Sequence, residues 1–115
     1  MGCPHRSKAQ VCDEVAQTMM RAQLIPNPGS AAHAREFAII AREAAKVLEG
    51  VRGVPEADVH RRDLETLAMR MDEMAERLSG DVVVAETSSF GDTYYEATKA
   101  VKTSSRAFTR WCAGH

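Results

Sequence analysis

The sequence predicts an all-α protein that folds as a single domain over residues 1–115, a four-helix antiparallel bundle with both termini at the same end. Four stretches carry apolar residues at helical spacing, and glycine or proline separates them. Hydrophobic residues make up 44% of the 115 and charged residues 27%, which is the composition of a soluble globular domain. Short connections favour antiparallel neighbours, and an even number of helices returns the chain to its starting end.

The first helix is expected over residues 7–24. Ser7 and Gln10 have the spacing of a capping box, in which each side chain bonds the backbone N–H of the other residue. Apolar residues recur at helical spacing from Val11 onward, and the helix must end before Pro26, which cannot continue it.

The two middle helices are expected over residues 30–49 and 55–79. The first of them is rich in alanine, which favours helix formation and lets a neighbouring helix approach closely. The second begins with Pro55 at a first-turn position, and its apolar residues alternate three and four apart, the spacing of knobs-into-holes packing. That stripe consists of Leu64, Leu67, Met71, Met74 and Leu78.

The last helix is expected over residues 88–112. Its acidic residues come early and its basic residues late, as the helix dipole favours. The segment before it, "DVVVAETSSF", is ambiguous because its valines favour an extended chain that has no second strand for pairing. We interpret it as an apolar connection over the end of the bundle, or as the first turn of an early-starting fourth helix.

The cysteines and histidines near the two ends of the sequence form a candidate zinc site. If the ends meet, two cysteines and two histidines supply a standard tetrahedral ligand set. The candidate ligands are Cys3, His5, Cys112 and His115. The repeated C-x2-C spacing of familiar zinc modules is absent, so the ordinary interpretation is free thiols and no cofactor. Oxidation would instead allow Cys112 to pair with Cys3 or Cys12.

Several side chains are expected on the outer surfaces of the helices, where they form a candidate partner-binding surface. Two are apolar residues that fall opposite the expected core faces, and the rest form a basic stripe with a tyrosine on the last helix. These residues are Ile39, Met69, Tyr95, Lys99, Lys102, Arg106 and Arg110. The stripe also has the charge to follow a phosphate backbone, but the third helix is rich in Asp and Glu and no helix-turn-helix pattern is evident, which argues against nucleic acid as the main partner.

Catalysis has little support in the sequence. His60 and Asp63 lie close together on the third helix, but no phosphate-binding glycine loop or recognisable nucleophile accompanies them. A histidine that forms a hydrogen bond at the end of the bundle is the simpler interpretation of His60.

The sequence therefore favours a small, cytoplasmic, non-enzymatic interaction or regulatory module that binds another protein or itself. No secretory signal or membrane-spanning stretch is visible, and small accessory proteins of bacteria and phages often have this size and form. The alternative is a zinc-stabilised or nucleic-acid-associated regulator that uses the terminal Cys and His residues and the basic face of the last helix.

Overall fold

The computed structural model describes residues 7–25, 31–51, 53–79 and 87–114, and within them every regular element is an α-helix. This confirms the predicted all-α class and the four helices. The helices are α1 (Lys8–Gln23), α2 (Ala31–Leu48), α3 (Pro55–Ser79) and α4 (Thr87–Ala113). Each bound falls within one residue of the expected range, because capping residues and prolines fix helix ends locally.

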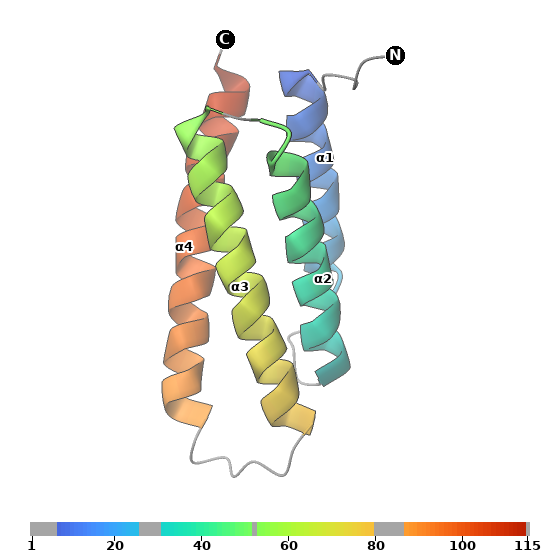
Figure 1. Cartoon of the computed structure of the whole chain (residues 1–115), viewed down its shortest axis with the longest axis vertical. Coiled ribbons are helices and arrows are strands. Elements are labelled where there is room, and N and C mark those ends of the chain that lie inside the picture. Colours follow the sequence, from blue (N-terminus) through green and yellow to red (C-terminus); the bar gives the residue numbers. More distant parts are fainter. Residues whose placement is uncertain (1–6, 26–30, 52, 80–86, 115) are drawn as a thin grey trace.

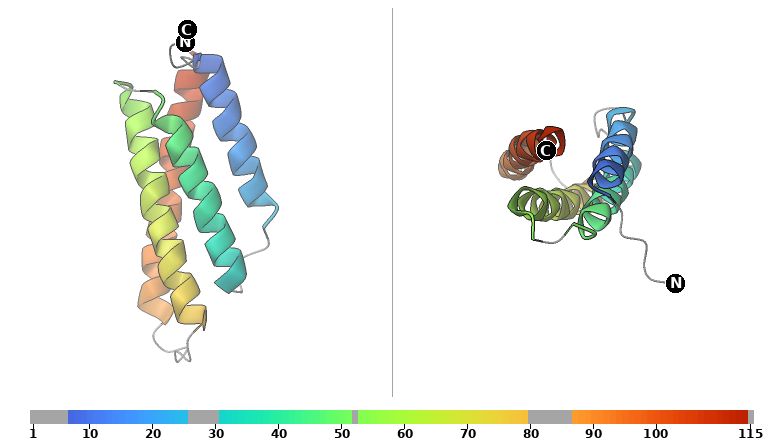
Figure 2. Two further views of the ribbon diagram at one scale, coloured as in Figure 1. Left: turned by 45° about the vertical axis from the view of Figure 1, so that its right-hand side comes forward. Right: turned by 90° about the horizontal axis from the view of Figure 1, so that it is seen from above.

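The helices lie side by side, and each one runs opposite to the next along the chain (Figure 1). The beginning of α1 and the end of α4 meet at the same end of the bundle, as the view from above also shows (Figure 2). α2 and α3 share the most extensive interface, followed by α3 with α4 and α1 with α2, whereas α1 and α4 touch least. One side of the bundle, between α1 and α4, is therefore less closely packed than the others.

The core combines the alanines of the two middle helices with larger residues of all four. Leu48, Leu64, Leu67 and Met71 are almost completely buried, and the predicted stripe of α3 supplies three of them. The fully buried alanines are Ala34, Ala38, Ala41, Ala44, Ala57 and Ala68. Because an alanine side chain is a single methyl group, the backbones of these helices can approach closely while the longer side chains fill the space around them.

The beginning of α1 has the predicted capping box. The Ser7 hydroxyl oxygen accepts a hydrogen bond from the Gln10 N–H at 3.2 Å, and the Gln10 side-chain carbonyl accepts one from the Ser7 N–H at 2.8 Å. In the connection between α2 and α3, Gly53 has a φ of 81°, which a residue with a side chain rarely adopts.

One other expectation of local structure lies partly outside the described residues. Of the ambiguous segment before the last helix, residues 87–90 belong to the first turn of α4, and residues 81–86 lie outside the described residues.

Candidate functional site

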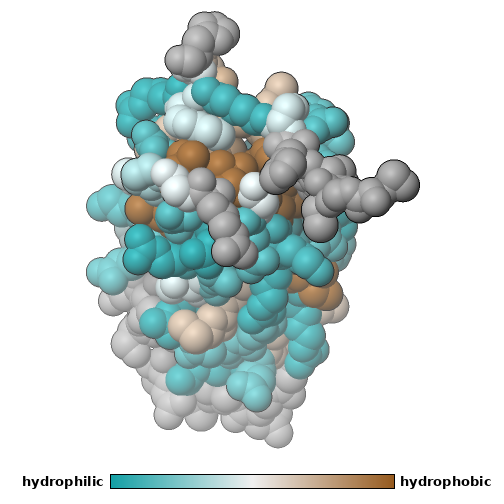
Figure 3. All heavy atoms as spheres, turned by 45° about the horizontal axis from the view of Figure 1, so that its top comes forward, coloured by the Kyte–Doolittle hydropathy of each residue, from teal (hydrophilic) through white to brown (hydrophobic). Residues whose placement is uncertain are grey.

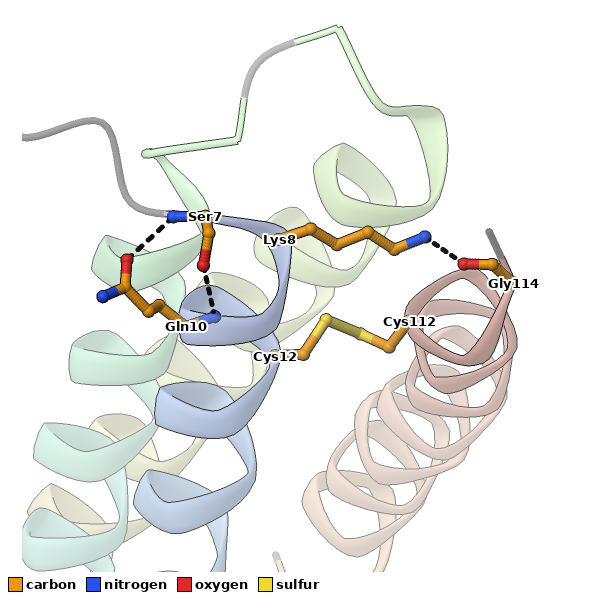
Figure 4. Close-up of a disulfide and its surroundings, with 6 residues drawn as sticks. All are labelled: Ser7, Lys8, Gln10, Cys12, Cys112 and Gly114. Carbon is orange, nitrogen blue, oxygen red and sulfur yellow. Dashed lines mark hydrogen bonds between the residues drawn. A yellow bond between two sulfur atoms is a disulfide. The ribbon is translucent and has the colours of Figure 1, made fainter.

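A disulfide between Cys12 and Cys112 joins the first turns of α1 to the last turn of α4 (Figure 4). The two residues are 100 positions apart in the sequence, and their Cα atoms lie 6.1 Å apart. Beside the disulfide, the Lys8 ammonium donates a hydrogen bond to the Gly114 carbonyl and lies 4.5 Å from the centre of the Trp111 ring. These contacts hold α1 and α4 together at this end, where apolar side chains gather on an otherwise mostly hydrophilic surface (Figure 3).

The disulfide corrects the expectation that all the cysteines are free thiols. Cys12 and Cys112 form one of the two pairs that the sequence allowed, because the capping box starts α1 at a point that brings Cys12 level with the end of α4. Disulfides are typical of oxidising compartments and rare in the cytosol, so this bond does not favour a cytoplasmic location. That location stays a prediction from the sequence.

The candidate zinc site stays untested. Cys3, His5 and His115 lie outside the described residues, and the sulfur of Cys112 is bonded to another sulfur rather than held as a metal-binding thiolate. Over the described ranges, no group of three or more His, Cys, Asp or Glu side chains is placed to hold a metal ion.

A groove runs along the side of the bundle between α1 and α4, starting at the disulfide. It consists of two adjoining hollows of about 560 and 380 Å³ that share Met19, Gln23, His60 and Ser105. Its α1 wall extends from Cys12 to Gln23 and its α4 wall from Val101 to Cys112. The other apolar residues that line it are Val15, Ala16, Met20, Ala22, Phe37 and Phe108.

His60 contributes to the floor of this groove and is only 1% exposed. Its Nδ1 and the Ser104 hydroxyl oxygen are hydrogen-bonded at 3.0 Å, and that hydroxyl donates to the Val101 carbonyl at 3.3 Å. Because the hydroxyl has one hydrogen, Nδ1 carries the imidazole proton. The ring also packs against Phe108, with 5.5 Å between the ring centres.

Burial governs the protonation of His60. It lowers the pKa of the imidazole to about 4, and the negative charge of Asp63 opposes that shift only partly. The ring is therefore neutral at pH 7. The hydrogen bond expected for His60 is present, and the ring joins α3 to α4 under the groove.

The basic stripe of α4 borders the groove. Lys99, Lys102, Arg106 and Arg110 are exposed, and no ion pair joins any of the four to another residue in the part of the chain that the structure describes. Lys102 and Arg106 line the groove itself, and Tyr95 is 66% exposed near the other end of the stripe.

Several arginines elsewhere in the bundle do have carboxylate partners. These pairs are Arg21–Glu43, Arg42–Asp72, Arg61–Glu65 and Arg70–Glu73, with N···O distances between 2.6 and 2.9 Å. The four cations of the basic stripe, in contrast, form no such ion pair within the described residues.

The two predicted apolar contact residues are exposed but lie away from this groove. Ile39 on α2 is 57% exposed and Met69 on α3 is 46% exposed, and neither lines one of its hollows. Sequence reasoning missed the groove itself, because Met19 and Phe37 have the spacing of ordinary core residues. The one indication of the groove in the sequence was that α1 has few bulky side chains. Such a helix fills little of the space beside α4.

A second hollow, of about 710 Å³, lies between α3 and α4 on the other side of α4. Its apolar lining includes Pro55, Val59 and Ala107, and its charged residues are mixed in sign. They are Glu56, Asp63, Glu96 and Lys99.

Comparisons with protein-family models, with curated proteins and with solved structures find no match for this chain. Among the described helices, none combines the length and the apolar character needed to cross a bilayer. The function must therefore be argued from the groove and the stripe themselves.

Proposed function

We propose that the protein is a small, non-enzymatic helical interaction module that binds another protein, or a second copy of itself, through its helical surfaces. The observation that carries this proposal is the basic stripe of α4 beside the apolar groove, with no carboxylate paired to its four cations within the described residues. Exposed arginine and aromatic side chains next to buried apolar surface are characteristic of protein interfaces.

The helix dipole alone does not explain the stripe. Cations near the carboxyl end of a helix are stabilised, but this effect falls off within the last turn. Arg110 lies in the last turn of α4, whereas Lys99 and Lys102 lie about three turns or more before its end at Ala113. The position of these two lysines supports a role in binding rather than in helix stability.

The second candidate function is a nucleic-acid-associated or zinc-stabilised regulator. The observation in its favour is the same stripe, because four cations and a tyrosine along one helix have the chemistry to contact a phosphate backbone. The net charge of -1 and the acidic residues of α3 would weaken such binding at physiological salt.

The test combines the mass in solution with capture of a partner. We expect either a mass by light scattering that rises with concentration, or specific retention of a protein from a lysate of the source cells on the immobilised chain. The variant Lys99→Glu/Arg110→Glu should reduce that association, whereas the control Lys46→Glu/Arg62→Glu, with the same charge change on α2 and α3, should not.

A strictly monomeric protein that retains no partner would contradict the proposal. Retardation of DNA or RNA at low salt that fades steeply as salt rises would favour the second candidate instead. Stoichiometric zinc by elemental analysis, with loss of helicity on chelation, would favour its zinc-stabilised form.

A further inference from the structure

We propose that the groove between α1 and α4 binds a single amphipathic helix of a partner protein whose polar face is acidic. This inference rests on the proposed function and names the class of partner. An amphipathic helix in a hydrophobic groove is a recurring mode of recognition, in which apolar side chains at helical spacing enter the groove and the polar face stays at its edge.

The groove has the length for such a helix. On α1 it extends from Cys12 to Gln23 and on α4 from Val101 to Cys112, so both walls have the same number of residues. At 1.5 Å per residue each wall is about 17 Å long, which corresponds to roughly three helical turns. A helix of that length presents three or four apolar side chains on one face.

The lining of the groove suits apolar side chains. Met19 on α1, Phe37 on α2 and Phe108 on α4 supply flexible and aromatic surface in three of the surrounding helices. Met20, at the α1 edge, is 62% exposed and extends this apolar surface outward. Methionine adapts its shape to different partners, which favours its use at binding surfaces.

The charge at the edges selects the partner. The α4 edge carries Lys102 and Arg106 in the groove, whereas Lys99 lines the hollow on the other side of α4. Of the described residues on the α1 edge, the charged one that lines the groove is Asp13, close to the disulfide, and its carboxylate accepts a hydrogen bond from Gln17 at 2.9 Å. Carboxylates along one flank of a bound helix would meet the α4 cations.

The hollow between α3 and α4 does not offer the same selection. Its three carboxylates would repel an acidic helix. A basic helix would meet one unfavourable charge there, that of Lys99. The groove between α1 and α4 also has walls that are already joined at one end by the Cys12–Cys112 disulfide, so less conformational freedom is lost when a ligand enters.

Fluorescence anisotropy with a defined probe tests this proposal. The probe is a fluorescein-labelled, cross-linked helical peptide of about four turns, with leucines on one face and glutamates on the other. The control peptide has lysine in place of every glutamate. We expect the oxidised, full-length protein to bind the glutamate peptide at least tenfold more tightly than the lysine peptide, with an affinity that falls as salt rises.

Two pairs of variants locate the binding site. Lys102→Glu/Arg106→Glu should weaken binding of the glutamate peptide by about tenfold or more, since two attractions become repulsions. Lys46→Glu/Arg62→Glu, with the same charge change away from the groove, should bind like the unaltered protein. Ala16→Trp, which places a bulky ring on the exposed α1 wall, should abolish binding, whereas Ala32→Trp on the exposed face of α2 should not.

Circular dichroism verifies that each variant is folded, and the charge-reversal pair keeps the test decisive if Ala16→Trp unfolds. Equal binding of the two peptides, or unchanged binding by Lys102→Glu/Arg106→Glu, would overturn the proposal. If Ala16→Trp abolishes self-association instead, the groove binds a second copy of the chain, and the proposed partner is wrong. If Ala16→Trp abolishes binding of nucleic acid, the groove binds nucleic acid rather than a helix, and the proposal is also wrong. A partner captured equally well by all groove variants would leave the proposed function standing and refute the groove.

Discussion

The interface between α2 and α3 and the side between α1 and α4 are stabilised in different ways. α2 and α3 share the most extensive contact in the bundle, and both contribute completely buried alanines, among them Ala41 and Ala68. α1 and α4 touch least, and a disulfide with the contacts of Lys8 joins them at one end. Below that end, a groove separates them.

The difference shows how a small bundle can combine a closely packed part with an open groove. Close packing of small side chains gives α2 and α3 many weak contacts that leave little space for a ligand. A cross-link, in contrast, restrains two helices without filling the space between them. The groove therefore remains accessible while its walls stay connected.

The largest expected effect comes from removing the disulfide. Cys12→Ser/Cys112→Ser should lower the free energy of unfolding by roughly 4 kcal/mol, because a cross-link between residues 100 apart strongly restricts the unfolded chain. Urea unfolding of the oxidised protein and the variant measures the loss. Hydrogen exchange should show that amides of α1 lose protection first, while those of α2 and α3 remain protected.

The reduced, unaltered protein is the control for this change. It should unfold at the same urea concentration as the double variant, since both lack the cross-link. The two proteins differ only in having a sulfur or an oxygen atom in the side chains at positions 12 and 112. An oxidised protein that is no more stable than its reduced form would contradict the role given to the disulfide.

A somewhat smaller effect is expected from pH, through the histidine between the two regions. The pKa of His60 is about 4 in the folded protein and about 6.5 in an unfolded chain, so the unfolded state binds more protons between these values. This contribution to stability is complete above pH 6.5 and is lost as the pH falls towards 4. Its full size is about 3 kcal/mol, since each pKa unit corresponds to about 1.4 kcal/mol.

Urea unfolding between pH 7.5 and 4 measures this dependence, and His60→Gln serves as the comparison. The difference in unfolding free energy between the two proteins should shrink by about 3 kcal/mol as the pH falls, because position 60 titrates only in the unaltered protein. Carboxylates that titrate in both proteins cancel in that difference. A constant difference would show that the imidazole is not desolvated.

The sequence was sufficient to predict the fold because its strongest signals are local. Each of these signals acts within one or two helical turns, and the helix bounds follow from them. They are the capping box of Ser7 and Gln10, Pro55 at the start of α3, and the apolar spacing of α3. The arrangement of four amphipathic helices then has few alternatives when the connections are short.

The groove and the disulfide were harder to predict because they depend on how two helices distant in sequence are separated in space. Apolar spacing marks Met19 and Phe37 as inward-facing, but it does not show whether α4 comes close enough to cover them. The spacing also left the partner of Cys112 open, since the choice depends on whether Cys3 or Cys12 is level with it. The basic stripe was visible in the sequence because charge on one helix face needs no tertiary information.

The smallest effect compares the same substitution in the two regions. Ala41→Leu adds three carbon atoms at a completely buried position of α2, and we expect it to lower the free energy of unfolding by about 2 kcal/mol because the neighbouring helix must move. Ala16→Leu adds the same atoms to the exposed α1 wall of the groove, where space is present, so its effect should be within about 0.5 kcal/mol. Urea unfolding of the two variants at pH 7.5 measures both values. Equal destabilisation would mean that α1 and α4 are packed as closely as α2 and α3, and the distinction between a packed core and an open groove would fail.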